Sequence, residues 1–167
     1  MNKKWEVCQE DEEKIAKLAE QNNLSHLLAS ILINRNIDTN EKVEQFISPT
    51  RSDFHDPFLM PDMEKAVERI LKAIQIKEKV IIYGDYDVDG ITSITVLKKY
   101  LLERGLSVGE YTPNRLDEGY GLNKAAVKSI CEQGYTLMIT VDCGISGNEE
   151  IEYAKELGIE VIVTDHH

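Results

Sequence analysis

The stretch that decides the fold is Lys79-Val80-Ile81-Ile82-Tyr83-Gly84-Asp85-Tyr86-Asp87-Val88-Asp89-Gly90. Its first half is a short, β-branched apolar run, which predicts a buried strand of a parallel sheet. Its second half places Asp85, Asp87 and Asp89 at alternate positions directly after that strand. Carboxylates this close together repel one another unless a cation lies among them. Because open α/β sheets bind ligands at the carboxyl ends of their strands, the stretch also predicts a cation site.

Two later apolar runs end in the same way. The run 136–141 leads into Asp142-Cys143-Gly144, and the run 159–164 leads into Asp165-His166-His167, where the sequence ends. If these strands lie side by side, five aspartates and two histidines meet at one edge of the sheet. Carboxylate and imidazole ligands in this mixture suit Mn²⁺, Mg²⁺ or Zn²⁺. A chain that ends on such a strand terminus is expected to be part of a longer one.

From residue 61 onward the pattern alternates between helix and strand. The expected helices cover 63–74, the segment from Thr92 to Arg104, a helix capped by Asn123, and one opened by the capping-box pair Ser146 and Glu149. The expected strands cover 80–84, 106–112, 136–141 and 159–164. This order predicts an α/β fold, a doubly wound and mainly parallel sheet with flanking helices, truncated at its C-terminal end.

The first sixty residues predict a small helical region and a connector. Asp38 and Glu41 form a capping-box pattern for a short helix whose inward face would be Val43, Phe46 and Ile47. Residues 49–61 are rich in Pro, Asp and Ser and indicate a connector. An earlier helix face is predicted by the spacing of five apolar residues, namely Leu24, Leu27, Leu28, Ile31 and Leu32.

Composition limits the class of protein. The chain has 167 residues, 42% of them hydrophobic, enough for one ordinary globular domain or for a domain with an extension. Cys8, Cys131 and Cys143 form no CxxC pair, which excludes a zinc ribbon and favours a reducing compartment. No segment approaches the roughly 20 apolar residues of a membrane span, so we expect a soluble, cytoplasmic protein without membrane contact.

The net charge of −11 at first argues against nucleic acid as a partner, because phosphates are bound by Lys and Arg. The five strand-end aspartates supply part of this charge. Two divalent cations at the predicted site would cancel four of the negative charges.

Several alternatives compete for the aspartates. A calcium loop of the EF-hand kind needs a bidentate Glu at its twelfth position, where this chain has Val96. A haloacid-dehalogenase-like phosphatase would use Asp87-Val88-Asp89-Gly90 with Thr140, but Asp85 and Ile91 depart from that motif. A single aspartate before a helix is most often a cap, an explanation that fits three in six residues poorly.

Arg115 and Cys143 also have competing explanations. Arg115 lies on a loop at the same sheet edge, where its guanidinium suits a substrate phosphate, although Asp117 or Glu118 could pair with it instead. Cys143 is expected to be a small buried residue rather than a nucleophile, because no histidine adjoins it in the sequence.

The motifs Tyr83 to Gly90, Val141-Asp142-Cys143-Gly144 and Asp165-His166-His167, in this order, resemble those of the DHH phosphoesterase superfamily. Arg115 with Glu118-Gly119-Tyr120-Gly121 is similar to the RecJ-type single-strand-specific exonucleases. The superfamily's small-molecule pyrophosphatases have a histidine where this chain has Tyr83, which favours the nuclease branch. The resemblance implies that residues 61–167 are the first part of the catalytic domain and residues 1–60 a helical region with its connector.

The resemblance also implies roles for individual residues. It assigns two divalent cations, Mn²⁺ or Mg²⁺, to a site formed by five ligands, namely Asp85, Asp87, Asp89, Asp142 and His166. It gives a catalytic role to His167, close to the scissile phosphate. Asp142, at the end of the central strand, is expected to act in catalysis as the bridge between the cations. Asp165 is expected to support a histidine from outside the ligand set.

The implied function is a metal-dependent phosphodiesterase that degrades single-stranded DNA from 5′ to 3′ into mononucleotides, in DNA repair and recombination. The expected partners are single-stranded DNA and, in a full-length enzyme, single-strand-binding protein and a helicase. Three alternatives remain open. They are a dinucleotide phosphodiesterase of the same superfamily, a haloacid-dehalogenase-like phosphatase and a non-catalytic scaffold.

Overall fold

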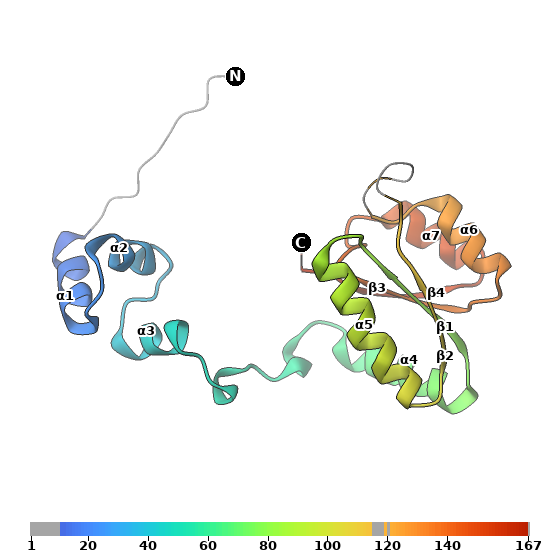
Figure 1. The fold of residues 1–167 in the computed structure, drawn as a ribbon, viewed down its shortest axis with the longest axis horizontal. Helices are drawn as coiled ribbons and strands as arrows, with labels where there is room; N and C mark the ends of the chain where they lie inside the picture. Colours follow the sequence, from blue (N-terminus) through green and yellow to red (C-terminus); the bar gives the residue numbers. More distant parts are fainter. Residues whose placement is uncertain (1–10, 115–118, 120, 167) are drawn as a thin grey trace, which may run out of the picture. The chain divides into compact units, whose positions relative to one another are not determined.

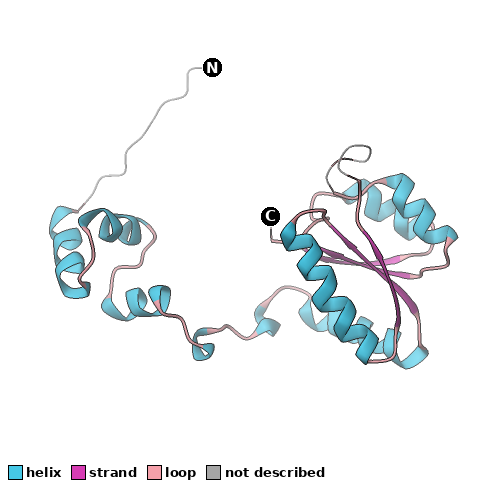
Figure 2. Ribbon diagram, viewed as in Figure 1, coloured by secondary structure: helices cyan, strands magenta, loops and turns pink. Residues whose placement is uncertain are grey.

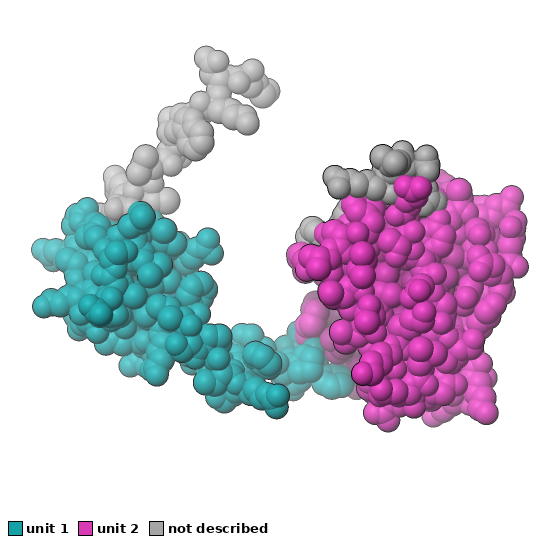
Figure 3. All heavy atoms as spheres, viewed as in Figure 1, with its two compact units in different colours: residues 1–59 teal, residues 60–167 magenta. Residues whose placement is uncertain are grey.

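The computed structural model describes residues 11–114, 119 and 121–166. It divides the chain into two compact units, Met1–Leu59 and Met60–His167, which Figure 3 distinguishes by colour. Among the described residues no helix is long and apolar enough to cross a membrane.

The described part of the first unit consists of helices joined by loops. Its elements are α1 (Glu12–Asn22), α2 (His26–Asn34) and α3 (Asn40–Ile47), followed by the short 3-10 helices Arg51–Asp53 and Pro57–Leu59. Each α-helix begins at a side-chain cap that accepts a backbone N–H, and these caps are Asp11, Ser25 and Thr39. The three helices share one small apolar core, formed by Ile15, Leu18, Ala29, Leu32 and Val43.

The predicted apolar faces of this unit are wrong in part. In α2, Leu27 and Ile31 are exposed, whereas Ala29 and Leu32 are buried. The helix begins at His26 after the cap Ser25, so Leu24 lies outside it, and its packing against α1 uses the smaller side chain of Ala29. A spacing pattern cannot separate two adjacent faces of a helix that is apolar on most of its surface.

The predicted start and inward face of α3 also need correction. Val43 is buried, but Phe46 and Ile47 lie about half exposed at the C-terminal end of the helix. The cap is Thr39, whose hydroxyl accepts the Lys42 N–H, and not Asp38. Asp38 instead forms an ion pair with the Lys42 ammonium group.

The second unit is an α/β fold, as predicted. Its elements in order are α4 (Met63–Ile76), β1 (Lys79–Gly84), α5 (Val88–Glu103), β2 (Ser107–Tyr111), α6 (Lys124–Glu132), β3 (Leu137–Val141), α7 (Asn148–Glu156) and β4 (Glu160–Thr164). Its strands form a four-stranded sheet in the order β2-β1-β3-β4, and every neighbouring pair is parallel (Figure 1). The order reverses beside β1, which makes the sheet doubly wound.

Helices cover both faces of this sheet (Figure 2). On one face α4 and α5 pack over the even-numbered residues of β1, including Val80 and Ile82. On the other face α6 and α7 pack over the odd-numbered ones, Ile81 and Tyr83. Because side chains alternate along a strand, burial on both faces explains why the run is apolar without a break.

The helix boundaries differ from the prediction at two places. Helix α5 begins at Val88 with Asp87 as its cap, one turn earlier than the predicted start at Thr92. Helix α7 follows Gly147 with no side-chain cap bond, so the capping box of Ser146 and Glu149 is wrong. The predicted cap Asn123 is confirmed, since its carboxamide oxygen accepts the Ala126 N–H of α6.

Candidate cation site

The parallel registers bring three strand ends to the same edge of the sheet. Gly84 of β1 pairs with Val141 of β3, which pairs in turn with Thr164 of β4. The next residue on each strand is an aspartate, so Asp85, Asp142 and Asp165 leave the sheet side by side. Since β3 lies between the other two strands, Asp142 has a central place at this edge.

Three of the predicted ligands lie close together. One ligand atom from each of Asp89, Asp142 and His166 lies within 4.8 Å of the other two. We call these three residues the cation cluster. The Nε2 atom of His166 is 2.7 Å from Oδ1 of Asp142, whose side chain is 5% exposed, while the imidazole is 69% exposed. Asp142 is therefore the buried member of the cluster, whereas Asp89 and His166 are exposed to solvent.

Asp85 contributes a buried carboxylate at the same edge of the sheet. It is 2% exposed, and its Oδ1 atom has no hydrogen-bond partner among the described residues. An unpaired oxygen of this kind costs free energy unless a cation or a water satisfies it. The described structure thus shows an orphaned carboxylate oxygen at the edge where the sequence predicts a cation.

Asp87, another predicted ligand, lies at the start of α5. Its side chain is exposed and caps α5 by accepting the Gly90 N–H at 2.9 Å. It lies outside the cation cluster, whereas Asp89, in the first helical turn, belongs to it. As a cap, Asp87 fixes the start of the helix that presents Asp89.

Asp165 and Cys143 support the same edge in different ways. The Oδ2 atom of Asp165 accepts the Ile145 N–H at 3.0 Å, which ties the end of β4 to the loop after β3. Cys143 is fully buried. Burial first, and then the negative charges of Asp165, Asp85 and Asp142, raise the pKa of its thiol to about 12. The thiolate is therefore scarce at neutral pH, in agreement with a packing role.

Tyr83 occupies the position that distinguishes the nuclease branch of the superfamily from the pyrophosphatases. Its side chain does not belong to the cation cluster. It is fully buried, its ring stacks on Tyr111 with centroids 5.1 Å apart, and its hydroxyl donates to the Gly121 carbonyl at 2.9 Å. The tyrosine thus supports the loop after β2 instead of supplying a ligand.

The remaining predicted residues, Arg115 and His167, lie outside the described residues, and their roles stay predictions. Sequence reasoning missed two residues of the site, Gly90 and Thr164. An ideal Cβ on Gly90 would lie 2.4 Å from the Asp85 carbonyl oxygen, so only glycine fits where the first turn of α5 meets the Asp85 backbone. The one available signal was a glycine within an otherwise helical stretch, which often marks a close backbone approach.

The donor set fits a hard divalent cation. Two carboxylates and one imidazole converge, and a third carboxylate lies buried nearby. Mn²⁺ and Mg²⁺ prefer oxygen ligands, and Mn²⁺ also accepts imidazole. Acidic groups this close repel one another, and a bound cation would remove that cost.

Comparison with known proteins gives the same picture. The family model described as "DHH family, N-terminal domain" matches residues 79–167. The single-stranded-DNA-specific exonuclease RecJ of Bacillus subtilis is 46% identical over 164 residues, 98% of this chain and 21% of its own length. The RecJ protein of Escherichia coli is 42% identical over 106 residues, which are 63% of this chain and 18% of that protein.

Solved structures agree with these sequence matches. A crystal structure of exonuclease RecJ bound to manganese is 38% identical, with a TM-score of 0.61 over 65% of this chain and 29% of that one. A RecJ from Thermus thermophilus in complex with Mn²⁺ shares the fold, with a TM-score of 0.65 over 93% of this chain and 21% of that one. The chain spans about a fifth of the length of the curated relatives it matches.

Proposed function

Because the chain belongs to the DHH family, we propose that it forms the cation-binding part of a phosphodiesterase that degrades single-stranded DNA. The observation that supports this most strongly is the convergence of Asp89, Asp142 and His166 within 4.8 Å of one another. Similarity to RecJ proteins described as single-stranded-DNA-specific exonucleases supports the substrate class.

The cation cluster would hold Mn²⁺ or Mg²⁺, with Asp85 and Asp87 as further candidate ligands for a second cation. When bound, such cations lower the pKa of a coordinated water and stabilise negative charge on the phosphoryl group. The chain's own residues have separate roles at this site. Asp142 keeps a buried negative charge at the centre of the sheet edge, while the exposed His166 leaves one side open to a phosphate. His167 and Arg115 would contact the scissile phosphate.

The finer parts of the proposal follow from the family resemblance. They are digestion from 5′ to 3′, release of mononucleotides, action in repair and recombination, a cytoplasmic location, and single-strand-binding protein and a helicase as partners. Tyr83 supports the nuclease branch against the superfamily's small-molecule pyrophosphatases. Its buried, stacked ring leaves no ligand at the position where those enzymes have a histidine.

The test is a nuclease assay on the full-length protein that contains this chain. With Mn²⁺ we expect release of mononucleotides from a 5′-phosphorylated single strand and little from the matching duplex. Asp142→Ala should lower the rate of nucleotide release more than about a hundredfold. Loss of a residue that only supports a metal ligand typically costs roughly 10- to 100-fold, and loss of a ligand should cost more. The matched control is Glu132→Ala, which removes an exposed acid on α6 and should leave the rate unchanged.

Three results would contradict the proposal. The first is full activity of Asp142→Ala, the second is equal digestion of duplex, and the third is undiminished activity with all divalent cations chelated. Cleavage of short dinucleotides in preference to long single strands would favour the dinucleotide phosphodiesterase instead.

A further inference from the structure

Asp142 has an unusual backbone conformation. Its φ angle is +59°, in the left-handed region that residues with a Cβ rarely enter. Aspartate tolerates this region better than most residues, but the conformation still needs support from the surrounding structure. It occurs directly after β3, at a residue whose carboxylate belongs to the cation cluster.

The end of β4 holds this turn on both sides. The backbone carbonyl of Thr164 accepts the Asp142 N–H at 3.0 Å. The Thr164 hydroxyl donates to the Thr140 carbonyl at 2.7 Å, before the turn. The Asp165 carboxylate accepts the Ile145 N–H at 3.0 Å, after the turn. Two side chains and one carbonyl of a neighbouring strand therefore fix the segment from Thr140 to Ile145.

The turn itself has little freedom to adjust. Gly144 has a φ of +110°, and a Cβ there would lie 2.9 Å from the hydroxyl oxygen of the buried Thr140. Ile145 is 59% exposed, so water would compete for its amide if Asp165 did not bind it. The bond from Asp165 thus fixes a loop that would otherwise move at the surface.

We propose that Thr164 and Asp165 are positioning residues, which hold the turn at Asp142 so that its carboxylate faces Asp89 and His166. The proposal rests on the proposed function, because the position of Asp142 matters only if a cation binds there. This role of Asp165 is distinct from the support of a histidine that the sequence predicts, because it is exerted through the Ile145 amide. Outer-shell partners of this kind typically change cation affinity by roughly 10- to 100-fold.

The test measures two properties of the protein and of matched variants. Amide hydrogen exchange by NMR reports on the Ile145 N–H, and calorimetry reports on Mn²⁺ affinity. Asp165→Ala removes the acceptor, whereas Asp165→Asn keeps an oxygen of the same shape but removes the charge. Thr164→Val removes the hydroxyl, and Thr164→Ser keeps it. The control Thr95→Val removes the hydroxyl bond to the Ile91 carbonyl on the exposed side of α5.

For Asp165→Ala we expect Ile145 amide exchange that is at least about threefold faster, because its hydrogen bond is lost. For Asp165→Ala and Thr164→Val we expect roughly tenfold weaker Mn²⁺ binding. Asp165→Asn and Thr164→Ser should restore most of each property. Thr95→Val should change neither.

Two outcomes would overturn the positioning role. One is unchanged Ile145 exchange in Asp165→Ala. The other is equal loss of affinity in Asp165→Asn and Asp165→Ala, because Asp165 would then act through its charge alone. Absence of Mn²⁺ binding by the wild type would count against the proposed function, while amide exchange would still show whether the two residues hold the turn.

Discussion

At the scale of single residues, Gly90 occupies a place where no side chain fits. A Cβ there would lie 2.4 Å from the carbonyl oxygen of Asp85 and 2.7 Å from its carbonyl carbon and its nitrogen. Gly90 belongs to α5, where alanine is normally favoured over glycine by about 1 kcal/mol. The contact with the Asp85 backbone reverses that preference, because backbone atoms at the end of a buried strand cannot move aside.

We therefore expect Gly90→Ala to lower the free energy of unfolding by about 1–3 kcal/mol, as overpacked sites do. It should also weaken Mn²⁺ binding, because Asp89 lies next to Gly90 in the same helical turn. Denaturant unfolding and calorimetry measure the two effects.

The control is Gly158→Ala, at a positive φ of +82° with open space around it. It should cost about 1 kcal/mol through backbone strain alone and leave Mn²⁺ affinity unchanged. A stabilised Gly90→Ala protein would show that the Asp85 backbone yields, contrary to this argument.

Residue types and strand ends could be predicted for the site, but side-chain directions could not. The apolar runs placed Asp85, Asp142 and Asp165 at one edge because parallel strands end together. Which carboxylate of the triplet joins the cluster depends on where α5 begins. Asp87 caps that helix and Asp89 lies in its first turn, a difference that three equally spaced aspartates do not reveal. The left-handed φ of Asp142 depends on contacts with β4, which are distant in sequence.

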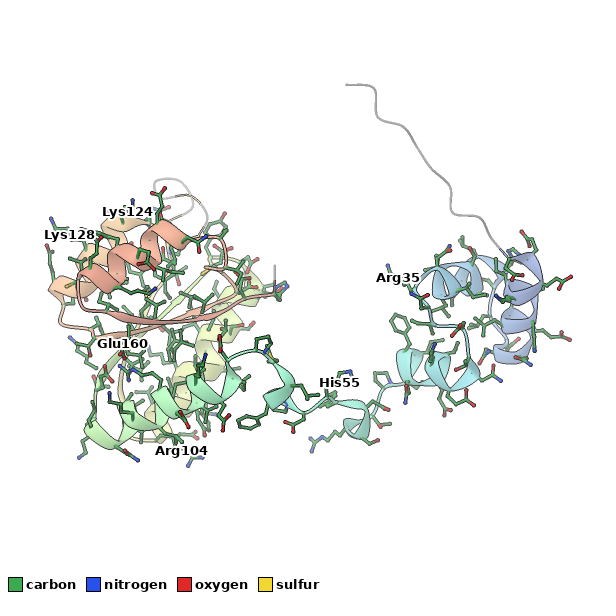
Figure 4. The ribbon with its side chains drawn as sticks, turned by 180° about the vertical axis from the view of Figure 1, so that it is seen from behind. Arg35, His55, Arg104, Lys124, Lys128 and Glu160 are labelled. Carbon is green, nitrogen blue, oxygen red and sulfur yellow. The ribbon has the colours of Figure 1, made fainter. Side chains whose placement is uncertain are left out.

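At the scale of elements, an ion-pair network joins α4 to the opposite edge of the sheet. Both terminal guanidinium nitrogens of Arg69 donate to the Glu78 carboxylate, at 2.7 and 2.8 Å. The Thr136 hydroxyl donates to the same carboxylate at 2.6 Å, and Arg69 also pairs with Glu160, which is labelled in Figure 4. The Glu78 side chain is 8% exposed, so water screens this pair only weakly.

We expect Glu78→Gln to lower the free energy of unfolding at pH 7 by about 1.5–3 kcal/mol, because charge-assisted hydrogen bonds from Arg69 are lost. The hydrogen bond from Arg69, together with that from Thr136, holds the pKa of Glu78 below its usual range, although burial acts in the opposite direction. Because this pKa is lowered, Glu78 becomes protonated at a lower pH in the folded state than in the unfolded state. The stabilisation is therefore complete above the pKa of Glu78 in the unfolded state, roughly 4.3. It is lost as the pH falls through the pKa of Glu78 in the folded state.

Denaturant unfolding of the wild type and of Glu78→Gln between pH 7 and pH 3 checks this. The difference between the two proteins should be largest near neutrality and shrink below about pH 4. Glu68→Gln, an exposed change on the same helix, should stay within about 0.5 kcal/mol of the wild type at each pH. A gap between wild type and Glu78→Gln that stays constant across this range would contradict the assigned ion pair.

The sequence predicts whether a segment is a helix or a strand, because each type follows from a local pattern of apolar residues. It predicts less well the residue at which a helix begins. Helix α5 begins one turn before Thr92 because Asp87 accepts the Gly90 N–H, and any of three aspartates could have been that cap. In α2 the buried residue Ala29 and the exposed residue Leu27 differ only by tertiary packing. Periodicity predicts that a helix has an apolar face, and contacts with other helices decide which one is used.

At the scale of the whole molecule, the two units have separate apolar cores. The core of the first unit contains only residues between Ile15 and Val43. Both cores of the second unit contain only residues from Ala73 onward. The cation cluster lies entirely in the second unit, between Asp89 and His166. Loss of the first core should therefore leave the described part of the site intact.

Leu32→Ala tests this separation. Leu32 is 1% exposed in the small helical core, so its truncation should cost about 2–5 kcal/mol, enough to unfold a unit of this size. We expect amide protection to disappear across α1, α2 and α3 and to persist in β1 and β3. Mn²⁺ affinity should remain within roughly a factor of two, because no described residue of the first unit belongs to the cluster. Leu27→Ala, on the same helix but 70% exposed, should change neither property. Loss of protection in β1 or β3 on Leu32→Ala would show instead that the two units unfold as one.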